Sequence, residues 1–332
     1  GHRTRVREER MSLGEFDIIE RYFSRLGRRP DVLLGVGDDA AVLAVAPGDR
    51  LVAAVDTIIE GVHFPDDLVA ADIGWRSLAV NLSDLAAMGA RPAWATLSLS
   101  LPTASADWLD GFAAGFAELA AQWDIALVGG DTVRGPLVVT VQVLGHIERD
   151  RWLTRSGARP GDLVVVSGTP GDAAAGLAAW PRRDRATAAE RSLIDRFTRP
   201  IPRIELGRQI RCRASAAMDI SDGLLTDLGK LCAASRCAAE IDLDRLPCSA
   251  ALASSATSSE REKYVLAGGD DYELVFTIGD HEYAELVKAE LAVDCTAIGR
   301  IRAGRGVICQ RNGVAVPAPV GGYDHFGTEP PA

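Results

Sequence analysis

Aspartates stand at the ends of apolar runs at six places in the chain, most of them beside glycine. They lie in the segments Gly37-Asp38-Asp39, Val55-Asp56-Thr57, Leu82-Ser83-Asp84, Gly129-Gly130-Asp131, Asp219-Ile220-Ser221-Asp222-Gly223 and Gly268-Gly269-Asp270-Asp271. Most follow β-branched or leucine-rich stretches, so we expect each carboxylate to stand where a buried strand emerges. Glycine at such a place lets the backbone come close to a ligand.

Several carboxylates in one cleft would repel one another unless a cation bound among them. At ~4 Å, a like-charged pair costs roughly 1 to 4 kcal/mol, depending on the local dielectric. Mg²⁺ takes oxygen ligands and shares them with phosphate groups. The pattern therefore predicts a site for metal ions and a polyphosphate.

Each aspartate taken singly also has a simpler explanation. Asp38, Asp56 and Asp131 are of a residue type that commonly accepts a backbone N–H in a turn. Asp84 falls near the C-terminal end of an expected helix, where negative charge is disfavoured. A bound cation would remove that conflict, and so would a neighbouring arginine. The recurrence of six such segments is what favours the metal site.

Common nucleotide-binding motifs are absent from the sequence. Its one Gly-Lys pair, Gly229-Lys230, is followed by leucine inside an expected helix, so it is not a P-loop. The glycine-rich stretch at 168–171 could cradle a phosphate, but a plain strand-to-helix turn is favoured. His63 has no second His or Cys nearby for zinc. A hydrogen bond from His63 to an anionic substrate and a structural role in its loop both stay open, and no pattern indicates a covalent nucleophile.

Length and composition limit the class of protein. A chain of 332 residues, 47% of them hydrophobic, suggests two domains with their own cores. The net charge of −10 without a basic cluster argues against a nucleic-acid partner, and no apolar run reaches the length of a membrane span. The six cysteines form no C-x-x-C pair, so we expect reduced thiols and a cytoplasmic protein. The start of the chain lacks the apolar stretch of a signal peptide.

Hydrophobic periodicity predicts a mixed α/β arrangement for the first half. Helices are expected at 15–26, 72–88 and 107–123, the second of them stopped by a left-handed Gly89. Strands are expected at 32–36, 51–55, 93–101, 125–128 and 137–144. The aromatic residues of the third helix have helical spacing, so we expect them in the core.

A polar, arginine-rich stretch at 149–161 marks the expected domain boundary. We expect a disordered arm at 1–11 that begins with the tag remnant Gly1-His2, an N-terminal domain at 12–150, a C-terminal α/β domain at 151–327 and a tail at 328–332. In the C-terminal domain, strands are expected at 163–166, 216–220, 272–278, 296–301 and 307–310. Ser221 is expected to cap the helix after the second of these strands, and 182–191 to be a solvated helix face.

Longer strings of residues occur in one order along the chain. They are Gly35-Val36-Gly37-Asp38-Asp39-Ala40, Ala79-Val80-Asn81-Leu82-Ser83-Asp84-Leu85-Ala86-Ala87-Met88-Gly89-Ala90, Val128-Gly129-Gly130-Asp131-Thr132, Asp219-Ile220-Ser221-Asp222-Gly223-Leu224, Gly268-Gly269-Asp270-Asp271-Tyr272-Glu273-Leu274 and Gly322-Tyr323-Asp324-His325-Phe326. In these strings the chain resembles the bacterial thiamine-monophosphate kinase family over residues 14–326. The stretches from Asn81 to Ala90 and from Gly268 to Leu274 are specific, whereas a lone Gly-Gly-Asp would be a weak signal.

This resemblance implies a fold and a reaction. The fold is the two-domain α/β (α+β) fold of the aminoimidazole-ribonucleotide synthetase superfamily, with an N-terminal domain that binds ATP and Mg²⁺ and pairs through its sheet in a homodimer. The reaction is the ATP-dependent conversion of thiamine monophosphate to thiamine diphosphate, by direct transfer of the γ-phosphoryl group. Such a transfer depends mostly on positioning and charge neutralisation, which agrees with a chain rich in carboxylates and poor in evident bases.

The resemblance also implies roles for particular residues. The implied Mg²⁺ ligands and their neighbours are Asp38, Asp39, Asp56, Asp84, Asp131, Asp219 and Asp222, of which Asp84, Asp131 and Asp222 are the most critical for catalysis. The implied ATP contacts are Gly130, Asp131, Arg155 and Ser221. The implied thiamine-phosphate contacts are His63, Asp270 and Tyr323.

Two departures from the family pattern bear on these roles. Many relatives carry a Ser/Thr-Thr pair before the aspartate at 56, where this chain has Ala54-Val55, so a metal contact there would use backbone carbonyls or be lost. Many relatives carry Glu where this chain has the shorter Asp270. Two alternatives also remain: another ATP-dependent member of the superfamily, and a non-catalytic nucleotide or metal sensor. No Cys precedes Cys212, which disfavours selenophosphate synthetases, and the Pro330-Pro331-Ala332 end disfavours hydrogenase-maturation relatives.

Overall fold

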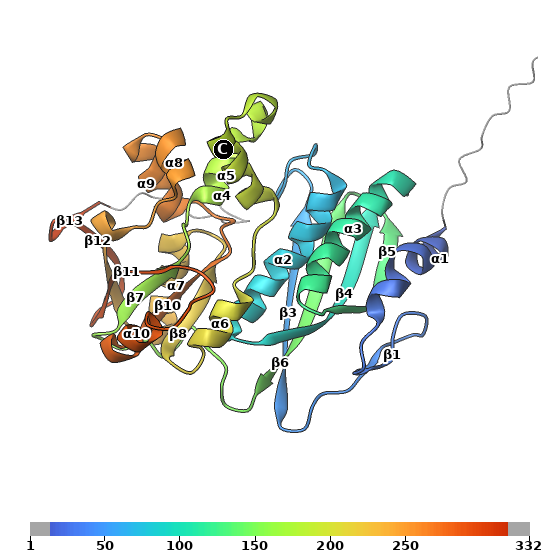
Figure 1. Cartoon of the computed structure of the whole chain (residues 1–332), viewed down its shortest axis with the longest axis horizontal. Coiled ribbons are helices and arrows are strands. Elements are labelled where there is room, and N and C mark those ends of the chain that lie inside the picture. Colours follow the sequence, from blue (N-terminus) through green and yellow to red (C-terminus); the bar gives the residue numbers. More distant parts are fainter. Residues whose placement is uncertain (1–13, 318–332) are drawn as a thin grey trace, which may run out of the picture. The chain divides into compact units, whose positions relative to one another are not determined.

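The computed structural model describes residues 14–317. Strands and helices alternate along the chain (Figure 1). Its contacts divide the chain into two units. Unit 1 comprises Gly1–Ala44, Thr57–Ser77 and Trp94–Val141, and unit 2 comprises Val45–Asp56, Leu78–Ala93 and Gln142–Ala332. The expected arm at 1–11 and tail at 328–332 lie outside the described residues. In the part of the chain that is described, no helix is both long and apolar enough to cross a membrane.

The described part of the first half contains a four-stranded sheet of order β3-β6-β4-β5. Its strands are β3 (Asp49–Ile59), β4 (Arg91–Leu101), β5 (Ala126–Arg134) and β6 (Val138–Glu148). The expected helices are present as α2 (Ala70–Met88) and α3 (Ala106–Gln122), which lie side by side in Figure 1. Their backbones approach so closely that a Cβ on Gly115 would lie 1.8 Å from the carbonyl oxygen of Ala71. Glycine is therefore required at this crossing.

The helix predictions for this half are mostly confirmed. Gly89 follows α2 with a φ of 71° and so ends it in the left-handed conformation. Phe112 and Phe116 of α3 are fully buried, as expected for core aromatics. The expected helix at 15–26 is instead three short pieces of different type: α1 (Glu15–Ile18), the π-helix η1 (Ile19–Phe23) and the 3₁₀-helix η2 (Ser24–Gly27).

Two aspartates do not stand where strands end. Strand β3 is longer than expected and contains Asp56, and strand β5 continues through Asp131. The expected strand at 32–36 is the short β1 (Val32–Leu34), which pairs with β2 (Val42–Leu43). The prediction of acidic turns is therefore wrong at positions 56 and 131, because pairing with β6 and β4 extends both strands past the local signals.

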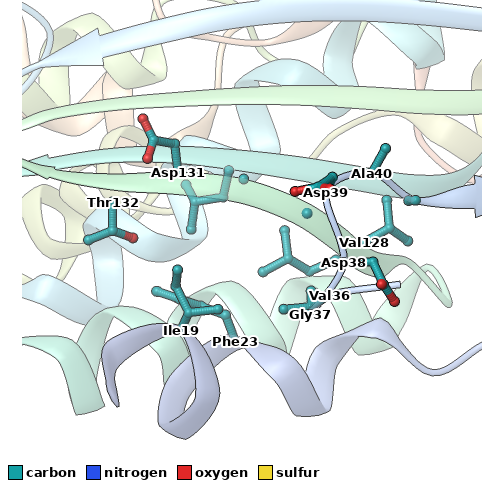
Figure 2. A pocket seen from close by; sticks show the side chains of 15 residues that line it. Ile19, Phe23, Val36, Gly37, Asp38, Asp39, Ala40, Val128, Asp131 and Thr132 are labelled. Atoms are coloured by element: carbon teal, nitrogen blue, oxygen red, sulfur yellow. The ribbon is translucent and has the colours of Figure 1, made fainter. Parts of the chain in front are cut away.

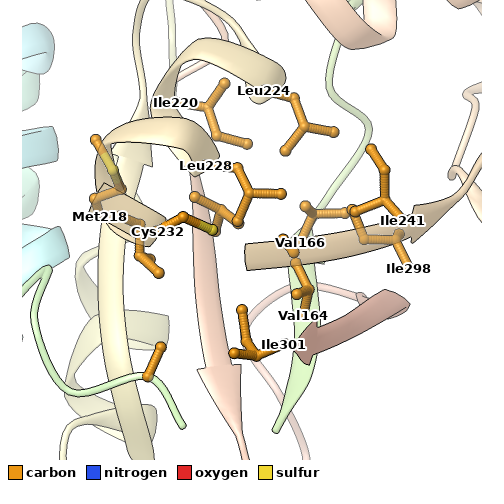
Figure 3. Close-up of a cluster of buried hydrophobic side chains, with 14 of the residues drawn as sticks. Val164, Val166, Met218, Ile220, Leu224, Leu228, Cys232, Ile241, Ile298 and Ile301 are labelled. Carbon is orange, nitrogen blue, oxygen red and sulfur yellow. The ribbon is translucent and has the colours of Figure 1, made fainter. Parts of the chain in front are cut away.

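The second half forms a seven-stranded sheet of order β13-β12-β9-β11-β7-β10-β8 within the described residues. Its strands are β7 (Leu163–Ser167), β8 (Ala214–Ile220), β9 (Ala238–Asp242), β10 (Glu273–Ile278), β11 (Cys295–Arg302), β12 (Gly306–Arg311) and β13 (Val314–Val316). Helix α7 (Leu224–Ser235) packs Leu224, Leu228 and Cys232 against this sheet, where Val166 and Ile298 meet them (Figure 3). The apolar spacing of three and four residues in α7 is what provides this buried face.

The remaining helices are short. They are α4 (Asp172–Ala179), η3 (Trp180–Arg185), α5 (Ala188–Thr198), α6 (Ile204–Ile210), η4 (Leu243–Arg245), α8 (Ala250–Ser255), α9 (Ser258–Ala267) and α10 (Asp280–Leu286). The expected helix at 182–191 is wrong, because the helical structure is interrupted between η3 and α5. Thr187 and Glu190 form a capping box at the start of α5. Ser221 is also not a helix cap, since α7 begins after Gly223.

Candidate active site

A cluster of carboxylates lies within unit 2. Burial raises the pKa of Asp84, and the nearby carboxylates of Asp219 and Asp56 raise it further, while Arg155 opposes them. Burial also raises the pKa of Asp219. Asp56 is more exposed, and its pKa is raised by partial desolvation and by the negative charge of Asp222. The four aspartates thus come from β3, α2, β8 and the turn after β8, and they affect one another's charge.

Helix α2 holds two of these carboxylate segments through its own side chains. The backbone N–H of Asp56 donates to Asn81 Oδ1 at 2.7 Å, and Ser83 Oγ donates to Asp219 Oδ2 at 2.7 Å. Asn81 and Ser83 are fully buried. The Asn81-Leu82-Ser83-Asp84 segment therefore orders β3 and β8 around Asp84, a role for Asn81 and Ser83 that the sequence did not reveal.

The turn after β8 is shaped by a residue that the sequence analysis missed. Asp227, with a fully buried side chain, accepts backbone N–H groups from Ser221 and Asp222 at 2.9 Å and from Gly223 at 3.2 Å, all on Oδ2. Lys230 also donates to Asp227, at 2.8 Å, and pairs with Asp222. A carboxylate one turn into a helix is an ordinary sequence feature. Its role as the acceptor of these backbone N–H groups is therefore visible only in the folded turn.

Asp270 lies beside that turn. Its backbone N–H donates to the carbonyl of Ser221, and the N–H of Tyr272 donates to the carbonyl of Ile220, both at 2.9 Å. Asp270 has a φ of 68°, and Tyr272 has a φ of 52°. The hydroxyl of Tyr272 donates to Asp270 Oδ1 at 3.2 Å. The Ser221 and Asp270 segments are thus held together by backbone bonds within unit 2.

The next residue of this motif, Asp271, has different hydrogen-bond partners from Asp270. Its buried carboxylate accepts the N–H of Gly171 at 2.7 Å and that of Ala173 at 3.2 Å. These are the amides that a phosphate would need at the start of α4. The glycine-rich stretch at 168–171 is therefore a structural turn, as the sequence analysis favoured.

A pocket lies in unit 1 beside a second group of predicted site residues. Its cavity of about 470 Å³ is lined by Asp38, Asp39, Gly130 and Asp131. Figure 2 shows Ile19 and Phe23 on one side of it, and Asp39 and Asp131 on the opposite side. A Cβ on Gly130 would lie 1.8 Å from the carbonyl oxygen of Leu97, and its φ is 156°, so only glycine fits between β5 and β4.

The other predicted site residues have varied positions. His63 accepts the N–H of Ile59 on Nδ1 at 3.1 Å, so it orders its own loop. The carbonyl of Arg155 accepts Ser235 Oγ at 2.9 Å, while its charge acts on Asp84 and Asp219 as described above. Tyr323 lies outside the described residues. Within residues 14–317, no three His, Cys, Asp or Glu side chains form a ready-made metal site.

Known proteins resemble this chain over nearly its whole length. The family models for the N-terminal and C-terminal domains of AIR synthase related protein match residues 37–147 and 159–311. The thiamine-monophosphate kinase of Escherichia coli (strain K12) is 45% identical over 96% of this chain and 100% of its own length. That of Haemophilus influenzae is 38% identical over 95% of this chain and 99% of its own.

Solved structures of related proteins are also similar to this chain in sequence and fold. Thiamine-monophosphate kinase from Stenotrophomonas maltophilia K279a is 49% identical, has a TM-score of 0.82, and covers 92% of this chain and 99% of its own. AaThiL complexed with AMPPCP and TMP is 32% identical with a TM-score of 0.76, over 98% of this chain and 100% of its own. The hydrogenase maturation protein HypE of E. coli, at 21% identity and a TM-score of 0.73 over 92% of this chain and 98% of its own, shares the fold alone.

Proposed function

The chain belongs to the thiamine-monophosphate kinase family, and on this premise we propose that its aspartate groups bind Mg²⁺ and ATP for direct phosphoryl transfer. The activity is the ATP-dependent phosphorylation of thiamine monophosphate, which gives thiamine diphosphate and ADP and completes thiamine diphosphate synthesis. The observation that carries this function is the 45% identity to a thiamine-monophosphate kinase over the whole length of that relative.

The carboxylates fit Mg²⁺ by their chemistry. They offer oxygen donors only, which is what this hard cation prefers. Burial and mutual repulsion raise the pKa values of Asp84, Asp219 and Asp56, so a cation among them would relieve a real cost. We assign Mg²⁺ binding in unit 2 to Asp56, Asp84, Asp219 and Asp222. In unit 1 we assign it to Asp39 and Asp131, with Asp38 as a neighbour.

The chain's own residues supply positioning rather than acid–base chemistry. When bound, Mg²⁺ would neutralise charge on the phosphates. The acceptor is already a phosphate anion and needs no strong base to become a nucleophile. Asn81 and Ser83 orient the carboxylate segments, Arg155 offers a forked donor for phosphate, and Gly130 and Ser221 present backbone close to ATP. With these residues in those roles, we propose in-line transfer without a phosphoenzyme.

We assign the thiamine-phosphate side to His63, Asp270 and Tyr323. His63 uses Nδ1 as an acceptor within its loop, so a neutral ring carries its proton on Nε2, the atom that suits an anionic substrate. The backbone of Asp270 is bonded to that of Ser221, one of the proposed ATP contacts, and its carboxylate suits the cationic or amino groups of thiamine.

We also propose a homodimer and a cytoplasmic location. Strand β3 is an edge of its sheet and carries Leu51 and Val55, whose exposed fractions of 50% and 57% are high for large apolar residues. Pairing of two copies at this edge would cover them. All six cysteines are free thiols, which suits a reducing compartment.

The direct test is an assay of the purified protein with ATP, Mg²⁺ and thiamine monophosphate. We expect thiamine diphosphate and ADP in equal amounts, and no product when Mg²⁺ is chelated. Protein that binds ATP but forms no thiamine diphosphate would instead indicate a nucleotide sensor. A requirement for a different phosphate acceptor would indicate another member of the superfamily.

A further inference from the structure

Lys230 places a positive charge beside the proposed metal site. Its ammonium group pairs with Asp222 and, at 2.8 Å, with Asp227 Oδ1. Asp222 is one of the carboxylates assigned to Mg²⁺ above, and its charge also reaches Asp56. A divalent cation that uses Asp222 must therefore share that carboxylate with Lys230 or displace it.

The two partners of Lys230 differ in burial and in their other contacts. Asp227 is fully buried, and its Oδ2 is fixed by the three backbone N–H groups of the turn. Its other oxygen holds Lys230. The side chains of Lys230 and Asp222 are 41% and 31% exposed, so both have room to move. If Lys230 gives up Asp222, it keeps Asp227 as a partner and remains neutralised.

We propose that Lys230 is a tethered counter-ion that holds Asp222 and yields it to a divalent cation, and so sets the cation concentration at which the site fills. Asp227 is then the positioning residue that anchors both the turn and the lysine. This inference rests on the proposed function, because it takes Asp222 as a contact of Mg²⁺.

The choice of residue type agrees with this role. The chain has 36 basic residues, of which only Lys230, Lys263 and Lys288 are lysines. An ammonium is a compact point charge on a flexible stem, whereas a guanidinium binds a carboxylate through a rigid, planar fork. A counter-ion that must release its partner is better served by the ammonium.

The test measures Mn²⁺ binding without nucleotide, by electron paramagnetic resonance of the free ion, on the purified full chain. We expect Lys230→Met to lower the dissociation constant for Mn²⁺ by roughly two- to fivefold, the range for loss of one partly exposed charge pair. Lys230→Arg keeps the charge and should bind Mn²⁺ no more tightly than the unmodified protein. Lys288→Met is the matched control, because Lys288 pairs with Glu285 at 2.6 Å in the same i,i+3 arrangement on an exposed surface.

A double variant ties the effect to Asp222. In an Asp222→Asn background, Lys230→Met should no longer tighten Mn²⁺ binding, because the shared carboxylate is gone. Unchanged or weaker Mn²⁺ binding in Lys230→Met would overturn the inference, as would an equal effect of Lys288→Met. If the cation effects appear but thiamine monophosphate is not phosphorylated, the proposed function fails while the counter-ion role of Lys230 stands.

Discussion

Asp84 is surrounded by groups that make its negative charge costly. It is partly buried, and Asp219 and Asp56 lie near it, with Arg155 as a partial compensation. We therefore expect Asp84→Asn to lower turnover by roughly 100-fold or more, and to leave the melting temperature unchanged or raised when Mg²⁺ is absent. Steady-state kinetics and thermal unfolding measure the two effects.

Asp110→Asn provides the control for that variant, since Asp110 is an exposed aspartate of α3. It should change neither quantity. Near-normal turnover in Asp84→Asn would remove Asp84 from the metal site, and a large fall in melting temperature would mean that the residue serves the fold.

The same carboxylates predict how stability depends on pH. Their pKa values in the folded chain are raised, so between about pH 4 and those raised values the folded state holds more protons than the unfolded state. Stability without Mg²⁺ should therefore fall as pH rises through that window. Mg²⁺ should reverse the fall, because it favours the charged forms. Melting curves at several pH values, with and without chelator, check both statements. Asp84→Asn should flatten the curve, and an unchanged slope would contradict this origin.

Ser83 donates a hydrogen bond to a neighbouring carboxylate and is not itself assigned to a ligand. Ser83→Ala leaves the buried Asp219 without the donor at 2.7 Å, which should cost about 1 to 3 kcal/mol of unfolding free energy. Urea unfolding in the presence of a chelator gives this value. Ser254→Ala, which removes an exposed side-chain bond to the carbonyl of Ala251, should have little effect. Equal stability of the two variants would show that Asp219 does not depend on Ser83.

At the scale of elements, the turn between β8 and α7 depends on Asp227. Asp227→Ala removes the acceptor of three backbone N–H groups and should cost about 1 to 3 kcal/mol. Asp227→Asn retains one oxygen that can face those groups, so it should cost less. Urea unfolding orders the variants, and an Ala variant as stable as the Asn variant would contradict the role of the oxygen in shaping the turn.

Helices with strong hydrophobic periodicity were predictable from the sequence. The lengthening of strands by pairing with distant strands was not. The bounds of α2 and α3 were expected to within two residues. By contrast, β3 and β5 run past Asp56 and Asp131 because their partner strands extend them. The positions of Asn81 and Asp227 on helices look unremarkable in sequence, since their partners are distant backbone groups or a turn that forms only in the fold.

At the scale of the whole molecule, order along the chain was the most informative signal. Six motif strings in sequence indicated both the family and its two-domain fold, which the domain models and relatives confirm. The particular roles of the aspartates, the domain boundary near residue 150 and the role of Tyr323 stay predictions. Carboxylates of the same type follow similar apolar runs, so sequence alone does not separate metal ligands from neighbours.

Dimer formation can be tested at the exposed edge of β3. If two copies pair there, Leu51→Glu places a charge in the interface and should shift the protein to the monomer. Sedimentation velocity measures the change. Val314→Glu is the matched control, because Val314 on β13 is 66% exposed and is not assigned to the interface. A wild-type chain that sediments as a monomer at all concentrations would contradict the proposal.

The hydrogen bond between the Asp56 N–H and Asn81 joins an edge strand to a buried helix side chain. An amide on an open edge ordinarily exchanges its proton with solvent quickly, whereas this one is held by a fully buried acceptor. Its deuterium uptake therefore reports opening between β3 and α2, next to Asp84. Exchange of this single amide proton thus reports how often the backbone at the carboxylate cluster opens.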